Sequence, residues 1–158
     1  RAMPNTPALI NTGITALFAN SRILPEQRDQ AESIMCAVGK VVWVEDETLM
    51  DTVTAVSGSG PAYFFYFMEA LEQAAIDEGL DGETARLLTL ETALGAARLA
   101  IETKKSPLEL RGQVTSPGGT TEAAIQILEH AGMSQILKLA VTAARKRSAD
   151  LAISSGTG

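Results

Sequence analysis

The chain has 158 residues, of which 46% are apolar and 20% are charged, a composition that predicts a globular protein and not a disordered one. Its formal net charge of -6 argues against a surface built to hold a nucleic-acid backbone. A single cysteine and a single histidine exclude an intrachain disulfide framework and a zinc site of the usual Cys/His kind, so we expect no metal.

The first 44 residues predict two helices and one extended segment. Residues 6–20 predict a helix, because proline follows the N-cap threonine and apolar residues then recur at helical spacing. Pro25 opens a second helix, which should end near Gly39. The short β-branched run at 40–44 has no visible partner strand. The expected fold class is therefore all-α, with at most one short extended segment near residues 40–44.

The remainder of the chain predicts helices only. They are expected over residues 47–56, 61–79, 82–103, 107–114, 120–132 and 134–153. The helix that begins at Pro61 contains five consecutive aromatic residues, 63–67, which point all the way round its axis. Such a helix needs cover on every side, so we expect part of its surface to form an oligomer interface.

The sequence gives no sign of a membrane or export signal. No apolar run approaches the roughly 18 to 20 residues that span a bilayer. The first residues lack a charged start followed by an apolar block and a cleavage site. Together with the lone cysteine, this favours a reducing compartment, and we expect a cytoplasmic protein.

The segment from Ser116 to Thr121, which reads SPGGTT, is the strongest candidate for a functional site. It lies between two predicted helices, so several backbone N–H groups should face one concavity at the positive end of a helix dipole. Gly118 and Gly119 leave room for a ligand, and the neighbouring hydroxyls add donors. These features predict an anion site suited to a carboxylate. The alternative is an ordinary turn and N-cap, and the local residues do not decide between them.

Three stretches together resemble pyrroline-5-carboxylate reductase: RAMPNTPA at the start, DTVTAVSGSGPAYFF in the middle and LRGQVTSPGGTTEAAIQILE near the end. The resemblance is to the C-terminal helical half of that family, and it implies a dimerisation and substrate-binding domain over residues 1–158. The family's N-terminal Rossmann domain, which holds NADPH or NADH, is expected to be absent from this chain. The implied activity is NAD(P)H-dependent reduction of 1-pyrroline-5-carboxylate to L-proline, in proline biosynthesis, with the isolated fragment inactive.

The resemblance also implies roles for individual residues. Those implied to bind the imino acid are Ser116, Gly118, Gly119, Thr120 and Thr121. Those implied to contact the cofactor are Asn5, Pro61 and Gln113, the last at a position where the family often has asparagine. Thr121 is the implied catalytic residue, because it matches a threonine whose hydroxyl meets the ring nitrogen. We expect this hydroxyl to orient the C=N bond more than to donate a proton.

The family's helical domains interlock as a homodimer, and each active site combines the nucleotide domain of one subunit with the helical domain of its partner. The resemblance therefore implies a homodimer, which in some members assembles further into rings. We expect neither a nucleic-acid nor a membrane partner. An alternative from a different class is a stand-alone helical dimerisation or small-carboxylate-binding module without catalysis.

Overall fold

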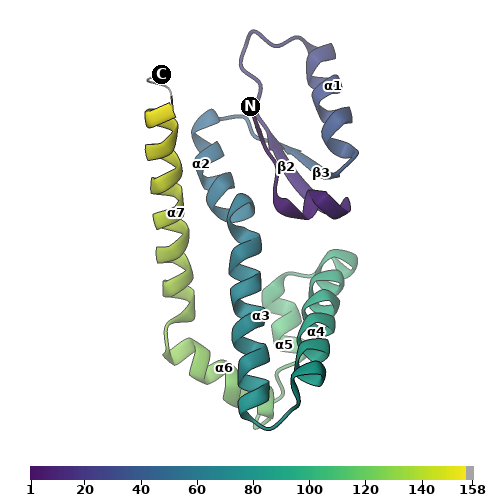
Figure 1. The fold of residues 1–158 in the computed structure, drawn as a ribbon, viewed down its shortest axis with the longest axis vertical. Helices are drawn as coiled ribbons and strands as arrows, with labels where there is room; N and C mark the ends of the chain where they lie inside the picture. The colour runs from purple at the N-terminus through teal and green to yellow at the C-terminus, as the bar shows by residue number, and fades with distance from the viewer. Residues whose placement is uncertain (156–158) are drawn as a thin grey trace. The chain divides into compact units, whose positions relative to one another are not determined.

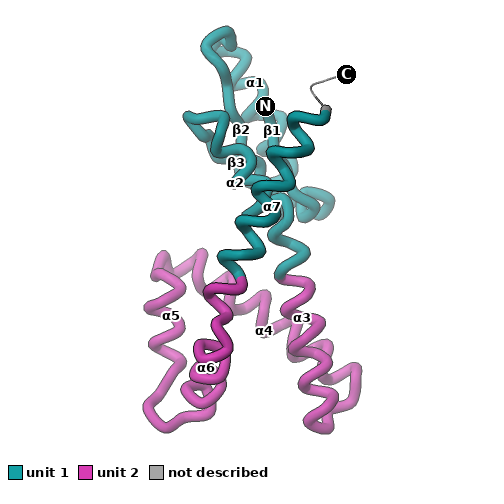
Figure 2. Tube along the Cα trace, turned by 90° about the vertical axis from the view of Figure 1, so that its left-hand side faces the viewer, with its two compact units in different colours: residues 1–63, 137–158 teal, residues 64–136 magenta. Residues whose placement is uncertain are grey.

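The structure is a computed structural model that describes residues 1–155 (Figure 1). Its backbone divides into two compact units (Figure 2). Unit 1 contains residues 1–63 and the chain from Leu137 onward, and unit 2 contains residues 64–136. The last three residues of the domain expected over 1–158 lie outside the described residues, and that assignment stays a prediction.

Unit 1 contains a three-stranded sheet with the order β1-β2-β3. The strands are β1 (Ala2–Met3), β2 (Gly13–Leu17) and β3 (Gly39–Trp43). β1 pairs antiparallel with β2, and β2 pairs in parallel with β3 in a register that sets Gly13 beside Gly39. The central strand is buried at Thr15, Ala16 and Leu17, so the core of unit 1 includes β2.

The mostly helical fold is confirmed, but the helix predicted over residues 6–20 is wrong. The chain instead forms the 3-10 helix η1 (Thr6–Ile10), a left-handed turn at Asn11 and then β2. The apolar spacing fits a helix, yet β2 gains backbone partners on both sides from β1 and β3, which no local pattern reveals. The extended segment near residues 40–44 is present as β3, and β1 and β2 are two strands that the prediction of at most one such segment did not include.

Helix α1 (Pro25–Cys36) packs against β3 in unit 1, as Figure 1 shows. The Trp43 indole Nε1 donates to Glu32 Oε2 at 2.8 Å, and the Arg28 guanidinium lies 4.2 Å from the centroid of the Trp43 ring. An exposed cation–π contact contributes about 0.5–1 kcal/mol. The single tryptophan therefore fastens α1 to the sheet, and the helix predicted to open at Pro25 is confirmed.

Three short helical turns lead from the sheet to the long helices. They are η2 (Glu47–Leu49), α2 (Met50–Val53) and the π-helical η3 (Thr54–Gly58). In η3 the Ser59 N–H donates to the Thr54 carbonyl at 2.8 Å, one residue beyond the α-helical spacing. Met50 and Ala55 are fully buried, and the Ser148 hydroxyl donates to Asp51 Oδ1 at 2.8 Å. This bond joins α2 to α7 (Met133–Ser155) inside unit 1.

Unit 2 contains the SPGGTT segment and is helical in its regular structure. Its helices are α3 (Gly60–Asp77) from residue 64 onward, α4 (Gly82–Thr103), α5 (Pro107–Gln113), α6 (Thr120–His130) and the first turn of α7. Two of these helices have side-chain caps, because Asp81 Oδ1 accepts from the Thr84 N–H at the start of α4 and a Ser106–Glu109 capping box opens α5. Only Ala85 and Thr89 are buried among residues 64–136, so the apolar side chains of this unit are largely uncovered.

Among the described helices, none combines the length and the apolar character that crossing a membrane requires.

Replacement of Gly39 by alanine tests the strand pairing. A Cβ at this position would overlap the Gly13 carbonyl oxygen of β2, and Gly39 has a φ of +153°. Gly39→Ala should therefore lower the free energy of unfolding by about 3 kcal/mol, since backbone would have to move. The matched control is Gly112→Ala in α5, where a Cβ meets no atom within 4 Å and helix propensity should add about 0.5–1 kcal/mol. Urea unfolding measures both, and equal midpoints would contradict the packing described.

Candidate functional site

The SPGGTT segment forms a tight loop between α5 and α6 in unit 2. The Gly119 N–H donates to the Ser116 carbonyl at 3.0 Å, which closes a turn. Gly118 has a φ of +72°, a left-handed conformation that glycine adopts freely and that costs other residues about 1–2 kcal/mol. The Thr115 hydroxyl donates to the Arg111 carbonyl at 2.6 Å and fixes the end of α5 from which the loop departs.

The first turn of α6 has no side-chain cap. Its N-cap residue is Gly119, which has no side-chain oxygen to accept a hydrogen bond. The N–H groups of Thr120, Thr121 and Glu122 have no acceptor within residues 1–155. Three adjacent amides at the positive end of a helix dipole suit an anion such as a carboxylate.

The two glycine amides of the loop are already used. The Gly118 N–H donates to Glu122 Oε2 at 2.7 Å, and the Gly119 N–H donates to the Ser116 carbonyl. Gly118 and Gly119 can therefore let a ligand approach the backbone closely, but their own amides are not open donors. The open amides are those of Thr120, Thr121 and Glu122. The binding roles expected for Ser116 and Thr120 stay predictions, and both residues are exposed.

Thr121 and Gln113 lie at the two ends of this loop region. Thr121 is half-buried on the first turn of α6, and its hydroxyl makes no hydrogen bond within the described residues. Gln113 is the exposed last residue of α5, and its amide group is likewise without a partner in the described part of the chain. Neither side chain has a hydrogen-bond partner in the described residues, and the catalytic role expected for Thr121 and the cofactor contact expected for Gln113 stay predictions.

Two polar contacts hold α5 and α6 around the loop. Arg111 Nη1 lies 2.8 Å from Glu129 Oε1, which joins the two helices. At the start of α5, hydrogen bonds from the Ser106 hydroxyl and backbone N–H lower the pKa of Glu109 below its usual value. A cavity of about 340 Å³ lies beside the loop, lined by Leu108, Arg111, Gly112, Thr115, Glu122, Ile125, Gln126 and Glu129.

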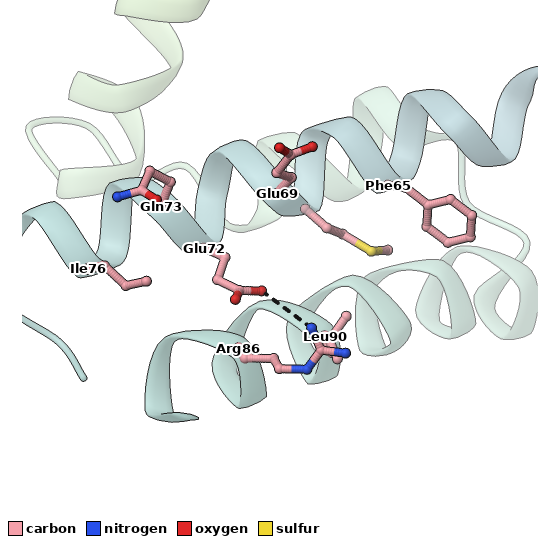
Figure 3. A pocket seen from close by; sticks show the side chains of 8 residues that line it. Phe65, Glu69, Glu72, Gln73, Ile76, Arg86 and Leu90 are labelled. Carbon is pink, nitrogen blue, oxygen red and sulfur yellow. Dashed lines mark ion pairs between the residues drawn. The ribbon is translucent and has the colours of Figure 1, made fainter. Parts of the chain in front are cut away.

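A second cavity of unit 2, of about 440 Å³, lies between α3 and α4 (Figure 3). Glu72 of α3 reaches toward Arg86 of α4, with 3.9 Å between Oε2 and Nη1. The other lining residues are Phe65, Met68, Glu69, Gln73, Ile76 and Leu90. None of the predicted site residues lines this cavity, and Glu72–Arg86 is a partly exposed ion pair whose stabilisation is small.

Asn5 connects three segments of unit 1. Its Nδ2 donates to the Ser57 carbonyl at 3.2 Å, and its Oδ1 accepts from the Ile14 N–H at 3.0 Å. The side chain therefore ties the start of η1 to β2 and to η3. One Nδ2 hydrogen stays available. The cofactor contact expected at Asn5 stays a prediction, on a residue that also has a structural role.

Pro61 and Tyr63 belong to unit 1, at the start of α3. Pro61 is half-buried directly after the N-terminal glycine of the helix, where proline's missing N–H costs no internal hydrogen bond. The Tyr63 hydroxyl oxygen is buried and has no hydrogen-bond partner in residues 1–155. Buried hydroxyls usually have a partner, so this one marks a point where a bound group or another chain could donate or accept.

Sequence reasoning missed Glu122 and Tyr63. Glu122 stands three residues after the N-cap glycine, the spacing of a capping box, and this signal was present in the sequence. Tyr63 lies within the run of five aromatic residues, and nothing in the sequence distinguishes its hydroxyl from that of Tyr66. Residues 113–121 lie in unit 2 and the other two predicted positions, Asn5 and Pro61, lie in unit 1.

No group of three or more His, Cys, Asp or Glu side chains is placed to hold a metal ion within residues 1–155.

Comparisons with known proteins agree on one family. A family model described as pyrroline-5-carboxylate reductase dimerisation matches residues 47–151. The chain is 51% identical over 152 residues to the pyrroline-5-carboxylate reductase of Pseudomonas aeruginosa, covering 96% of this chain and 56% of that protein. The chain therefore spans about half the length of the curated relatives it matches.

Two solved structures are similar to this fold. A pyrroline-5-carboxylate reductase from Coxiella burnetii has a TM-score of 0.92 and 53% identity, covering 96% of this chain and 56% of that one. The Plasmodium falciparum pyrroline carboxylate reductase, solved with NADP bound, has a TM-score of 0.87 and 31% identity, covering 93% and 60%. The agreement holds over nearly all of the chain.

Asn5 variants test the link between η1, β2 and η3. Asn5→Ala removes both hydrogen bonds and should lower the free energy of unfolding by about 2 kcal/mol, at about 1 kcal/mol for each bond. Asn5→Asp keeps the acceptor for the Ile14 N–H but loses the donor to the Ser57 carbonyl. Asn5→Asp should therefore lose more than half of the unfolding free energy that Asn5→Ala loses, because its carboxylate would face the Ser57 carbonyl. Thermal unfolding of both variants checks this order, and an unchanged melting temperature for Asn5→Ala would contradict it.

Proposed function

The chain belongs to the pyrroline-5-carboxylate reductase family, and we propose that the complete subunit reduces 1-pyrroline-5-carboxylate to L-proline with NADPH or NADH. The observation that carries the proposal is the loop before α6, where three adjacent amides have no acceptor in the described chain. The substrate is a small cyclic imine with one carboxylate, and that carboxylate matches the donors available.

In this proposal the substrate carboxylate accepts from the amides of Thr120, Thr121 and Glu122. The hydroxyls of Ser116 and Thr120 add donors at the rim of the loop, where both residues are exposed. Gly118 and Gly119 let the ligand approach the backbone, because neither has a side chain above the loop. Holding the carboxylate on backbone groups fixes the orientation of the ring before any bond changes.

Thr121 is the residue of this chain that meets the reacting atoms. Reduction adds a hydride to the imine carbon and a proton to the ring nitrogen, so the C=N bond becomes a C–N single bond. A threonine hydroxyl is a poor acid, and its work here is to hydrogen-bond the nitrogen and hold the C=N plane. The proton comes from the protonated imine or from water. The half-buried position of Thr121, with its hydroxyl unpartnered in the described chain, supports this role.

NADPH or NADH, when bound, supplies the hydride. The chain contains no GxGxxG motif, so we propose that the nucleotide is bound mainly by the part of the subunit that this chain does not cover. The residues of this chain expected beside the nicotinamide are Asn5, Pro61 and Gln113. The free Gln113 amide and the remaining Asn5 N–H have the chemistry to pair with the nicotinamide carboxamide, which supports their assignment.

We further propose that the helical region forms an interlocked homodimer. Unit 2 buries only Ala85 and Thr89. The side chains of Phe64 and Tyr66 on α3 are 68% and 73% exposed. Exposed aromatic surface of this extent is typical of an interface, and the matching family model is itself described as a dimerisation region. A second copy of the chain is the occupant that fits.

The proposal that the nucleotide is bound mainly outside this chain has a direct test. A protein limited to residues 1–158 should show no NADPH- or NADH-dependent reduction of 1-pyrroline-5-carboxylate, because it lacks a nucleotide-binding motif. The complete subunit should turn over, as measured by loss of nicotinamide absorbance. Turnover by the 1–158 protein would contradict the proposal that the nucleotide is bound mainly outside this chain. A complete subunit that binds small carboxylates without reducing the imine would favour the binding-module hypothesis.

Thr121 variants test the catalytic assignment in the complete subunit. Thr121→Val removes the hydroxyl at nearly constant volume and should lower kcat/KM by tenfold or more, which corresponds to about 1.4 kcal/mol of transition-state stabilisation. Thr121→Ser keeps the hydroxyl and should retain activity within about threefold. Steady-state kinetics with both variants measures the effect. Equal rates for Thr121→Val and the unmodified enzyme would remove Thr121 from the mechanism.

A further inference from the structure

We propose that Glu122 is a positioning residue, which closes the Ser116–Thr121 loop by accepting the Gly118 N–H and so keeps the amides of Thr120, Thr121 and Glu122 open for the substrate. The inference rests on the proposed reductase function for its consequences in catalysis. The contact itself belongs to the described chain. Glu122 Oε2 lies 2.7 Å from the Gly118 nitrogen, a short distance that is typical of a charge-assisted hydrogen bond.

The Glu122 carboxylate has no competing partner in the described residues. It forms no ion pair, because Arg111, which lines the same α5–α6 cavity, is engaged by Glu129 at 2.8 Å. Glu122 is half-buried on the first turn of α6. A half-buried carboxylate gains most from donors that satisfy its oxygens, so the Gly118 amide is a strong local anchor.

The start of α5 provides a comparison, because its N-cap residue has a side chain that accepts a backbone hydrogen bond. Ser106 is the N-cap there, its hydroxyl accepts from the Glu109 N–H, and Glu109 Oε2 accepts from the Ser106 N–H at 2.8 Å. In this capping box each of the two side chains accepts the backbone N–H of the other residue. Because Pro107 has no N–H, the Leu108 N–H is the one amide of this first turn that lacks an acceptor in the described residues.

The start of α6 has only the glutamate hydrogen bond of such a capping box, and that bond goes to the residue before the N-cap. Glu122 holds the third helical position, as Glu109 does in α5, but it reaches past the N-cap to Gly118. The N-cap amide of Gly119 is already taken by the Ser116 carbonyl. Because the N-cap is glycine, no hydroxyl fills the amides of the first turn. Glu122 thus orders the loop, and the glycine leaves the ligand side vacant.

The hydrogen bond matters because the loop it closes contains two adjacent glycines. Gly118 and Gly119 lose more backbone entropy on ordering than any other residue pair would. Without an acceptor at Glu122, the Gly118 amide is released and the left-handed turn is no longer tied to α6. The carboxylate of the substrate would then have to order the loop as it binds, and its affinity would fall. Thr121 stays on α6, so the chemical step should suffer less than binding.

Amide exchange tests the contact independently of the reaction. In the complete subunit without substrate or cofactor, hydrogen–deuterium exchange at Gly118 should accelerate about tenfold or more in Glu122→Ala, since a hydrogen bond to a charged group is lost. Glu122→Gln keeps a carbonyl acceptor and should exchange within about threefold of the unmodified protein. Unchanged exchange in Glu122→Ala would overturn the inference, whether or not the enzyme proves to be a reductase.

Kinetics test the consequence. The control is Glu78→Gln, which removes one exposed carboxylate that follows α3 and makes no side-chain contact with the loop in the described residues. Glu122→Ala should raise KM for 1-pyrroline-5-carboxylate about tenfold and lower kcat by less than about threefold. Glu122→Gln and Glu78→Gln should leave both within about threefold. A KM unchanged in Glu122→Ala, or raised equally in Glu122→Gln, would overturn the positioning role. Absence of turnover in the unmodified subunit would instead refute the proposed function.

Discussion

The first turn of α6 begins with three backbone amides that the chain itself does not satisfy, and the candidate site depends on this. Each helix must leave its first N–H groups to a cap, to water or to a ligand. Glycine at the N-cap costs only about a few tenths of a kcal/mol relative to the preferred capping residues, because water can reach the amides. Gly119 therefore keeps the site open at small cost, and the stability lost there is recovered by the Glu122–Gly118 hydrogen bond.

The chemistry assigned to this chain needs neutral donors and no poised acid or base. The carboxylates whose pKa values are clearly lowered are Asp46, Asp81 and Glu109, and each accepts hydrogen bonds at a helix start. None of the three belongs to the SPGGTT loop. A site made of amides and a threonine hydroxyl can hold a carboxylate and orient an imine, and it leaves electron transfer to a cofactor. The scarcity of histidine and cysteine in the sequence agrees with this division of work.

Local signals predicted α4, α5 and α6 well, because their caps and their apolar spacing lie within each helix. The Ser106–Glu109 capping box could be read from four consecutive residues. Residues 6–20 failed, because β2 is a strand only through its neighbours β1 and β3. In the site, the glycines and hydroxyls identified the loop. The role of Glu122 could not be read in the same way, since it depends on the Ser116 carbonyl having already taken the Gly119 amide.

The sparse core of unit 2 connects assembly to the site. Ordering a residue costs about 1–2 kcal/mol of backbone entropy, and a unit that buries only Ala85 and Thr89 recovers little of it from its own interior. In the proposed homodimer the missing burial comes from the second copy, which covers exposed aromatic side chains of α3 such as Phe64 and Tyr66. The loop between α5 and α6 belongs to the same unit, so in that homodimer the order of its amides would depend on the same association. Dimerisation and substrate binding would then be thermodynamically linked. A substitution that weakens the dimer interface would also lower the affinity for substrate, although it changes no residue of the loop.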